Sequence, residues 1–292
     1  MAATARPRRS VLYMPGSNAR ALEKGRSLAA DALILDLEDA VAPDAKALAR
    51  AQIAEAVEAG GYGGRELIVR VNALDSPWGR DDIAALAACG ADAILLPKVE
   101  SAAMVHEAAK LMDAAGAPAE TAIMCMMETP RGMLHAEEVA GASERLSCLV
   151  MGTSDLVKDL HASHTGARLP VLTALSLCLL AARACGLAIV DGVHLDLNDD
   201  EGFAAVCRQG KMLGFDGKTL IHPKTIAKAN EVFAPSDEEV AFSHRIIAAH
   251  AEAAAQGKGV VVVDGKLIEN LHVENAQRLV ALAEAISALQ GD

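Results

Sequence analysis

Short apolar runs recur along the chain, and alanine-rich segments separate them. The runs are rich in aliphatic side chains, as buried parallel strands are, and the segments between them are generally long enough for crossover helices. This pattern predicts an α/β fold, a (β/α)8 barrel of the TIM type. A doubly wound open sheet is the alternative, because counting runs does not show whether a sheet closes. The eight runs are Ser10–Met14, Ala32–Leu37, Leu67–Val71, Ala93–Pro97, Ala122–Met127, Cys148–Met151, Ala188–Val193 and Lys218–Ile221.

The pattern changes in the last part of the chain, where two long helical segments enclose a short strand and a turn. The strand and turn at Val260–Gly265 are typical of a hairpin. We therefore predict a TIM-barrel catalytic domain over residues 1–234 and a C-terminal helix-hairpin-helix tail over residues 235–292. An appendix of this kind often serves as a lid or an oligomer contact.

Composition narrows the class of protein. The chain is 52% hydrophobic but only 2% aromatic, so its core must be aliphatic. A net charge of -12 argues against a nucleic-acid partner, whose phosphates require many lysines and arginines. No apolar stretch of transmembrane length is free of glycine and charge, so we expect no membrane partner. The six cysteines show no CxxC spacing, and several lie within apolar runs, which predicts reduced, buried thiols in a cytoplasmic protein.

Two consecutive predicted strands each end in a carboxylate. Glu128 follows the run Ala122–Met127, and Asp155 follows the run Cys148–Met151. Parallel barrels carry their chemistry at the carboxyl ends of the strands, so the two acids are expected side by side. Oxygen ligands without a Cys or His cluster favour Mg²⁺, with Mn²⁺ as an alternative, over Zn²⁺. We predict that Glu128 and Asp155 hold the metal; the alternative is that both acids only cap the following helices.

Further charged residues follow the second and third runs. Arg70 ends a strand and would be costly there without an anion, and its planar group suits a carboxylate. It can grip a substrate, pair with the acids of the second strand, or do both. Asp36 and Glu38 point to the same side of an extended strand. They can orient groups around the metal or cap the next helix.

Several motifs, spread in order over nearly the whole chain, resemble the citrate lyase β-subunit-like family. This family includes malyl-CoA and citramalyl-CoA lyases and belongs to the HpcH/HpaI aldolase superfamily. The motifs are Arg9–Asn18, Asp36–Val41, Arg70–Asn72, Leu96–Lys98, Glu128–Pro130, Gly152–Leu156, Asp191–Val193, Gly214–Lys218 and Ile221–Pro223.

The resemblance implies a Mg²⁺-dependent TIM barrel, trimeric or a multiple of it, whose tail closes over the active site of a neighbouring subunit. It assigns the metal to Glu128 and Asp155 and the grip on a 2-oxo or 2-hydroxy acid to Arg70. Backbone amides near Ser154 and Asp155 are expected to hold the same carboxylate. CoA contacts fall on Tyr13 and Lys24.

One departure from the family concerns the tail. Lyases of this group present an Asp in a Gly-x-Met/Leu-Ile-Asp motif, whereas this chain has Glu269 at the last position. The additional methylene changes the reach of the carboxylate, and reaction geometry is sensitive to such displacements. Glu269 either keeps the acid/base role for a differently shaped substrate or marks a diverged activity. Asp264 is a candidate substitute.

The resemblance thus implies a carbon-carbon lyase that cleaves a malyl-CoA-type or citramalyl-CoA-type 3-hydroxyacyl-CoA to acetyl-CoA and a 2-oxo acid by retro-Claisen chemistry. Two alternatives share the site. One is a malyl-CoA-type thioesterase, and the other is a citrate lyase β-like subunit acting on an acyl-carrier protein. The partners expected are therefore a small acyl-CoA, a 2-oxo acid and further copies of the chain in a homo-oligomer.

Overall fold

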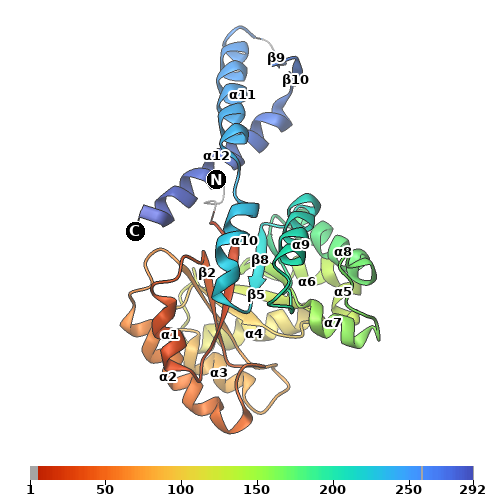
Figure 1. The fold of residues 1–292 in the computed structure, drawn as a ribbon. Helices are drawn as coiled ribbons and strands as arrows, with labels where there is room; N and C mark the ends of the chain where they lie inside the picture. The colour runs from red at the N-terminus through yellow and green to blue at the C-terminus, as the bar shows by residue number, and fades with distance from the viewer. Residues whose placement is uncertain (1–5, 258, 292) are drawn as a thin grey trace. The chain divides into compact units, whose positions relative to one another are not determined.

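Eight parallel strands form a closed barrel (Figure 1). The structure is a computed structural model that describes residues 6–257 and 259–291. Neighbouring strands follow the order of the sequence, and β1 pairs with β8 to close the barrel. The predicted TIM barrel is confirmed, and the open-sheet alternative is wrong. The strands are β1 Ser10–Pro15, β2 Ala32–Asp36, β3 Glu66–Arg70, β4 Ala93–Leu96, β5 Ala122–Met127, β6 Leu146–Met151, β7 Ala188–Asp191 and β8 Gly217–Leu220.

Helices connect the strands and surround the barrel (Figure 1). The α-helices of this unit are α1 Ala19–Gly25, α2 Lys46–Ala59, α3 Gly79–Leu86, α4 Ala102–Ala114, α5 Pro130–Leu134, α6 Ala136–Ala140, α7 Thr153–Asp159, α8 Leu172–Ala184, α9 Asp200–Leu213 and α10 Ile226–Phe233. Three 3-10 turns accompany them, η1 Pro43–Ala45, η2 Leu169–Val171 and η3 Pro223–Thr225.

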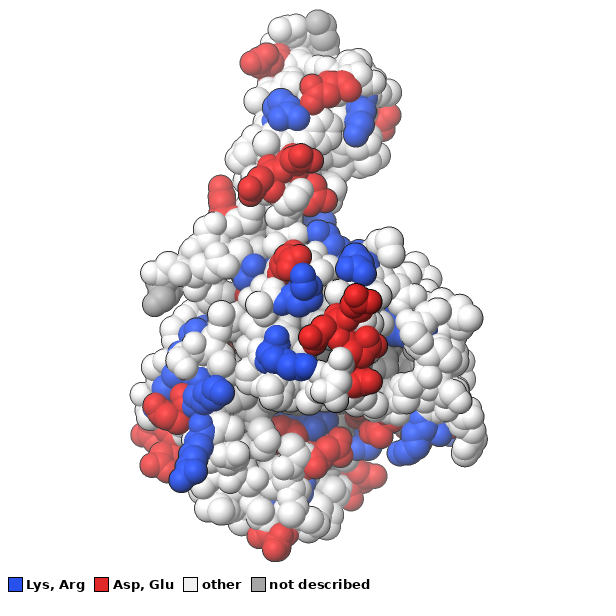
Figure 2. Space-filling model, viewed as in Figure 1, with Lys and Arg blue, Asp and Glu red and all other residues white. Residues whose placement is uncertain are grey.

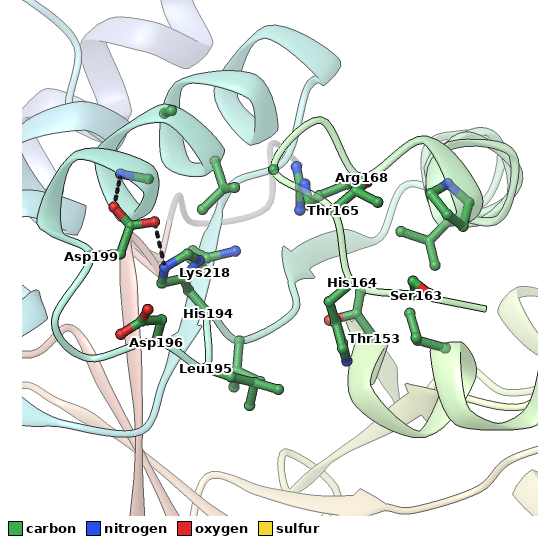
Figure 3. Close-up of a pocket in the computed structure, with 18 residues that line it drawn as sticks. Thr153, Ser163, His164, Thr165, Arg168, His194, Leu195, Asp196, Asp199 and Lys218 are labelled. Atoms are coloured by element: carbon green, nitrogen blue, oxygen red, sulfur yellow. Dashed lines mark hydrogen bonds and ion pairs between the residues drawn. The ribbon is translucent and has the colours of Figure 1, made fainter. Parts of the chain in front are cut away.

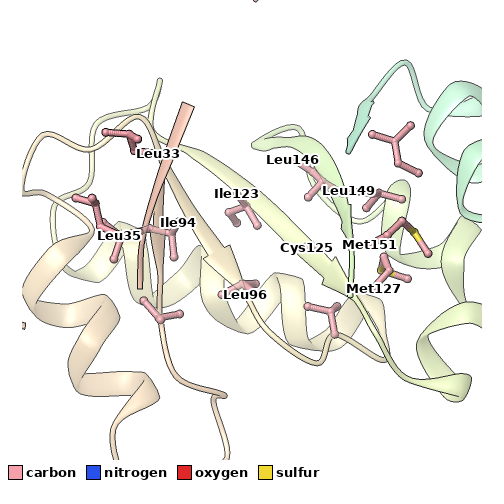
Figure 4. Packing of buried hydrophobic residues seen from close by; sticks show 14 of the residues in the cluster. Leu33, Leu35, Ile94, Leu96, Ile123, Cys125, Met127, Leu146, Leu149 and Met151 are labelled. Atoms are coloured by element: carbon pink, nitrogen blue, oxygen red, sulfur yellow. The ribbon is translucent and has the colours of Figure 1, made fainter. Parts of the chain in front are cut away.

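Alternation along each strand divides the core into two clusters. Side chains such as Ile34, Ile68 and Met126 form a cluster of strand residues that fills the barrel. Their strand neighbours point outward and pack against the helices, as the aliphatic side chains in Figure 4 show. Because successive side chains point to opposite faces, the position of a residue in its strand decides whether it faces the barrel interior or the helices.

The chain divides into two compact units. One is Arg8–Phe233, the barrel, and the other combines the residues before Arg8 with those from Ala234 onward. The second unit has a helix, a hairpin and a helix in the predicted order, and Ile246, Val263 and Ile268 belong to its small core. Residues 1–5, 258 and 292 of the predicted domains lie outside the described residues. The elements of this unit are α11 Asp237–Ala255, β9 Val261–Val263, β10 Lys266–Ile268 and α12 Asn270–Gly291.

The surface and the thiols add two observations. On the face shown in Figure 2, acidic and basic side chains of the barrel unit are interspersed. No helix in the described part of the chain is both long enough and apolar enough to cross a bilayer. All six cysteines are free, as predicted, and four are buried. Cys185 is exposed and Cys89 half-buried, so the prediction of buried thiols is wrong for these two. Cys185 follows the last residue of α8, where the chain turns at the surface.

Candidate active site

A cavity of about 340 Å³ opens at the carboxyl ends of the barrel strands; we call it the mouth cavity. Five of the predicted site residues line it together. The position in the strand explains the placement of Tyr13, Arg70 and Glu128. Each follows a side chain of the interior cluster by two residues, so its own side chain also points to the inner face of the barrel. The five lining residues are Tyr13, Arg70, Glu128, Ser154 and Asp155.

Glu128 is the most deeply placed acid of the predicted metal pair. It is only 3% exposed, and its Oε1 accepts a hydrogen bond of 2.8 Å from the backbone N–H of Lys98. Burial, and then the negative charge of Glu38, raise the pKa of Glu128 to about 8. Thr129, not Glu128, caps the N-terminus of α5 through a bond from the N–H of Gly132. Capping the following helix therefore does not account for Glu128.

Asp155 lies across from Glu128 in the first turn of α7, which follows the neighbouring strand β6. Its side chain is 27% exposed, and its oxygens lie 3.8 Å from Lys98 Nζ and 3.5 Å from Lys158 Nζ. Gly152 is the N-cap residue of α7, and no side-chain hydrogen bond caps this helix. Asp155 is therefore available to the cavity.

Gly152 leaves the space that Glu128 occupies. A Cβ built at Gly152 would collide with Cβ and Oε2 of Glu128 and lie 3.1 Å from its Cδ. Because Gly152 continues the inner face of β6, any larger residue there would displace the carboxylate. The motif Gly-Thr-Ser-Asp thus contains the predicted ligand Asp155 and leaves space for the Glu128 side chain.

Arg70 is held by several acids. Its Nε and Nη2 donate to the two carboxylate oxygens of Asp36 at 2.6 and 2.7 Å. Its Nη1 lies 2.8 Å from Glu38, and the guanidinium stacks 4.8 Å from the ring centroid of Tyr13. Asp36 also accepts from the backbone N–H of Ala40 and so fixes the following loop. The expected pairing of Arg70 with the acids of the second strand is confirmed. Asp36 caps no helix, so that interpretation is wrong for Asp36, while a role around the metal stays a prediction.

Lys98 is a central residue that was not predicted as a site residue. It adopts a left-handed backbone, with φ of 52°, and its N–H holds Glu128 while its Nζ pairs with Glu38. Burial lowers the pKa of Lys98, but the hydrogen bond and charge of Glu38 outweigh burial and raise it. The available sequence signal was a lysine directly after the fourth strand, in Leu96-Pro97-Lys98.

The charge balance of the mouth cavity fits a divalent cation. Three cationic side chains, Arg70, Lys98 and Lys158, lie near five acids at or beside the cavity. Within residues 6–257 and 259–291, no three His, Cys, Asp or Glu side chains could form a metal site by themselves. Mg²⁺ commonly takes one or two carboxylates and completes its octahedron with water and substrate oxygens. Glu128 and Asp155 match that donor set. The five acids are Asp36, Glu38, Asp39, Glu128 and Asp155.

Of the remaining predicted residues, Lys24 does not line the mouth cavity, and Glu269 and Asp264 belong to the tail unit. Lys24 is exposed in the last turn of α1. Glu269 is exposed directly after β10 in the tail unit, and its backbone N–H donates to His272 Nδ1 at 3.1 Å. Asp264 pairs with Arg245 at 3.0 Å. The roles of Lys24 and Glu269 stay predictions.

Comparisons with known proteins find relatives over nearly the whole chain. The family model described as HpcH/HpaI aldolase/citrate lyase matches residues 9–223. A (3S)-malyl-CoA thioesterase of Cereibacter sphaeroides is 53% identical over 288 residues, which cover 99% of this chain and 99% of that protein. An L-malyl-CoA/beta-methylmalyl-CoA lyase of the same species is 39% identical over 308 residues, covering 97% of each chain.

A solved structure extends the likeness to the fold. The crystal structure of CitE from Mycobacterium tuberculosis in complex with magnesium, acetoacetate and coenzyme A superposes with a TM-score of 0.75 at 29% identity. The superposition covers 97% of this chain and 100% of the CitE chain. The family resemblance read from the sequence motifs is confirmed.

Proposed function

The chain belongs to the HpcH/HpaI aldolase/citrate lyase family, and within it we propose a Mg²⁺-dependent enzyme that hydrolyses a malyl-CoA-type thioester to malate and free CoA. The observation that carries the proposal is the 53% identity to a (3S)-malyl-CoA thioesterase over 99% of both chains. The mouth cavity supports it, because an arginine and two metal-type carboxylates converge where a small hydroxy acid would bind.

The residues of the mouth cavity divide the work of binding. Arg70 would orient the malyl carboxylate from its place above Tyr13, and Asp36 holds the guanidinium in position. Glu128 and Asp155 would hold Mg²⁺, and Lys98 keeps Glu128 in place through its backbone N–H. When bound, Mg²⁺ supplies Lewis-acid polarisation of the substrate oxygens. Amides near Ser154 and Asp155 are our candidates for a second contact to the carboxylate.

Hydrolysis adds water across one bond. The water oxygen bonds to the thioester carbon, the C–S bond breaks, and the proton lost by water ends on the CoA thiolate. Glu269 is our candidate for the group that carries this proton, presented by the tail of a neighbouring subunit in a trimer or a multiple of it. We place the CoA near Tyr13 and Lys24, where the lysine offers a positive charge to phosphate. A cytoplasmic location stays a prediction.

Carbon-carbon cleavage is the second candidate function, supported by the 39% identity to a malyl-CoA lyase. It would use the same bound ester, but the proton would move to or from the acetyl methyl group. Products separate the two candidates. With (3S)-malyl-CoA and Mg²⁺, chromatography should show malate and CoA in equal amounts. Glyoxylate with acetyl-CoA would establish the lyase instead. Turnover of the free CoA ester by the isolated chain would eliminate a subunit that works only on an acyl-carrier protein.

A further inference from the structure

A second cavity, of about 440 Å³, lies against the outer side of the barrel wall; we call it the outer cavity. Lys218 lines it, and the partner of Lys218, Asp191, ends β7. Both occupy outward positions, because their strand neighbours Val190 and Thr219 continue the inner face. Figure 3 shows the cavity between the loop that carries Ser163 to Arg168 and the loop that carries His194 to Asp199.

An arginine with an uncommitted nitrogen lies at the floor of the outer cavity. Arg168 Nη1 donates to both oxygens of Asp191 at 2.7 and 2.6 Å, and its Nε donates to Gln209 at 2.7 Å. Its Nη2 is buried, and no hydrogen-bond partner for it is found among the described residues. A buried donor without an acceptor is costly, and a ligand oxygen would remove that cost.

Two cations and one carboxylate meet next to the cavity at Arg168, while two further acids, Asp196 and Asp199, line the facing loop. Lys218 is fully buried and also pairs with Asp191, so two cations share one carboxylate. The side chain of Arg168 is only 11% exposed, which limits screening by solvent. An anion at Arg168 Nη2 would complete this balance.

The walls limit the kind of anion. They are largely aliphatic, and Asp196 and Asp199 lie on the opposite loop, where they would repel a second negative charge (Figure 3). We propose that the outer cavity binds a small aliphatic monocarboxylate, with its carboxylate on Arg168 and its chain along the apolar walls. The aliphatic wall residues are Val157, Pro170, Val171, Val193, Leu195 and Val206.

This site is separate from the catalytic one and does not depend on the proposed function. Thr153, Val193 and Leu195 border both cavities, but Arg70, Glu128 and Asp155 line only the mouth cavity, and Arg168 and Lys218 only the outer one. A carboxylate that binds the outer cavity therefore needs neither Arg70 nor the metal ligands.

Binding of hexanoate, measured by calorimetry and ligand-observed NMR, tests the proposal. The wild-type chain should bind hexanoate about tenfold more tightly than hexan-1-ol, because only the acid offers a charged acceptor to Arg168. Succinate should bind at least about tenfold more weakly than hexanoate, because its second charge meets the acidic loop. Arg168→Gln should reduce the affinity for hexanoate to the affinity for hexan-1-ol.

Arg168 also neutralises the buried Asp191, so Arg168→Gln removes an ion pair of the fold as well as the proposed ligand contact. A second variant therefore separates loss of binding from loss of stability. Ala205 is an exposed small residue of α9 that lines the cavity, so Ala205→Phe should fill the space and abolish binding while circular dichroism stays unchanged. Arg70→Gln should leave hexanoate binding intact. Equal binding of hexanoate and hexan-1-ol, tighter binding of succinate, or binding that survives Ala205→Phe and disappears in Arg70→Gln would overturn the proposal.

Discussion

The mouth cavity and the outer cavity are each built around an arginine that a strand-end carboxylate holds, yet the charges next to the two arginines differ. At or beside the mouth cavity, five acids lie near Arg70, Lys98 and Lys158. Next to the outer cavity, Arg168 and Lys218 share Asp191, while Asp196 and Asp199 lie on the facing loop. The first arrangement calls for a cation and the second for an anion.

The direction of each strand-end side chain explains this difference. Asp36 and Arg70 occupy inner positions and converge in the barrel, whereas Asp191 and Lys218 occupy outer positions and meet beneath the helices. The same type of ion pair therefore serves two surfaces. A shift of one residue in a strand would exchange these surfaces.

Removal of the Glu128 charge tests whether the mouth cavity needs a cation, and it is expected to reduce activity more than any other change proposed here. Glu128→Gln keeps the shape of the side chain but weakens the metal site, so we expect kcat with malyl-CoA to fall about 10³-fold. Steady-state kinetics in excess Mg²⁺ measure this loss. The matched control is Glu137→Gln, a change of an exposed acid on α6, which should keep parental activity. Parental activity in Glu128→Gln would show that the mouth cavity functions without this ligand.

The pH dependence of Mg²⁺ binding tests whether Glu128 in the mouth cavity has a raised pKa. With a pKa of about 8, Glu128 holds a proton at lower pH, and the cation must displace that proton. Apparent Mg²⁺ affinity should therefore rise about tenfold per pH unit well below this pKa, or about 50-fold from pH 6 to 8, and then level off. Calorimetry at stepped pH gives both the affinity and the proton released. A flat affinity over this range would contradict the raised pKa.

Replacement of Arg70 by lysine tests whether the enzyme needs the planar guanidinium group or only a positive charge at this position. Arg70→Lys keeps the charge but cannot hold both oxygens of Asp36 and reach a substrate at once, so kcat/KM should fall roughly 30-fold. Arg208→Lys, a change at an exposed arginine of α9, is the matched control. If both variants behave alike in kinetics with malyl-CoA, Arg70 contributes charge alone.

Substitution of Gly152, which leaves space for Glu128, is expected to have the smallest effect on activity of these changes. A methyl group there would push the Glu128 carboxylate away, so Gly152→Ala should weaken Mg²⁺ binding and kcat about tenfold. At Gly141, the nearest atom to an added Cβ is 3.6 Å away, so Gly141→Ala should change neither. Kinetics over a Mg²⁺ titration compare the two variants. Unchanged Mg²⁺ dependence in Gly152→Ala would mean that Glu128 does not need its present position.

The sequence predicted the features that follow from strand periodicity. Eight apolar runs were enough to predict the barrel, and the acids that follow two of them were expected in one cavity, where the structure places Glu128 and Asp155. The role of Lys98 could not be predicted, because it depends on a left-handed backbone and on a side chain that reaches Glu38.

The outer cavity was hidden for a related reason. Arg168 lies in a loop without periodicity, and its contact with Asp191 and Lys218 depends on a fold that brings these distant segments together. Lys218 stands in a short strand, where its outward direction depends on the register with β7.

Binding of Mn²⁺ as a spectroscopic substitute for Mg²⁺ tests the central claim most directly. Electron paramagnetic resonance titration should show one Mn²⁺ per chain, displaced by Mg²⁺ and lost in both Glu128→Gln and Asp155→Asn. Asp159→Asn, a change of a nearby acid on α7 that pairs with Lys158 at 3.4 Å, should bind the metal as the parent does. Stoichiometric binding that survives in both Glu128→Gln and Asp155→Asn would contradict the assignment of the metal to the mouth cavity.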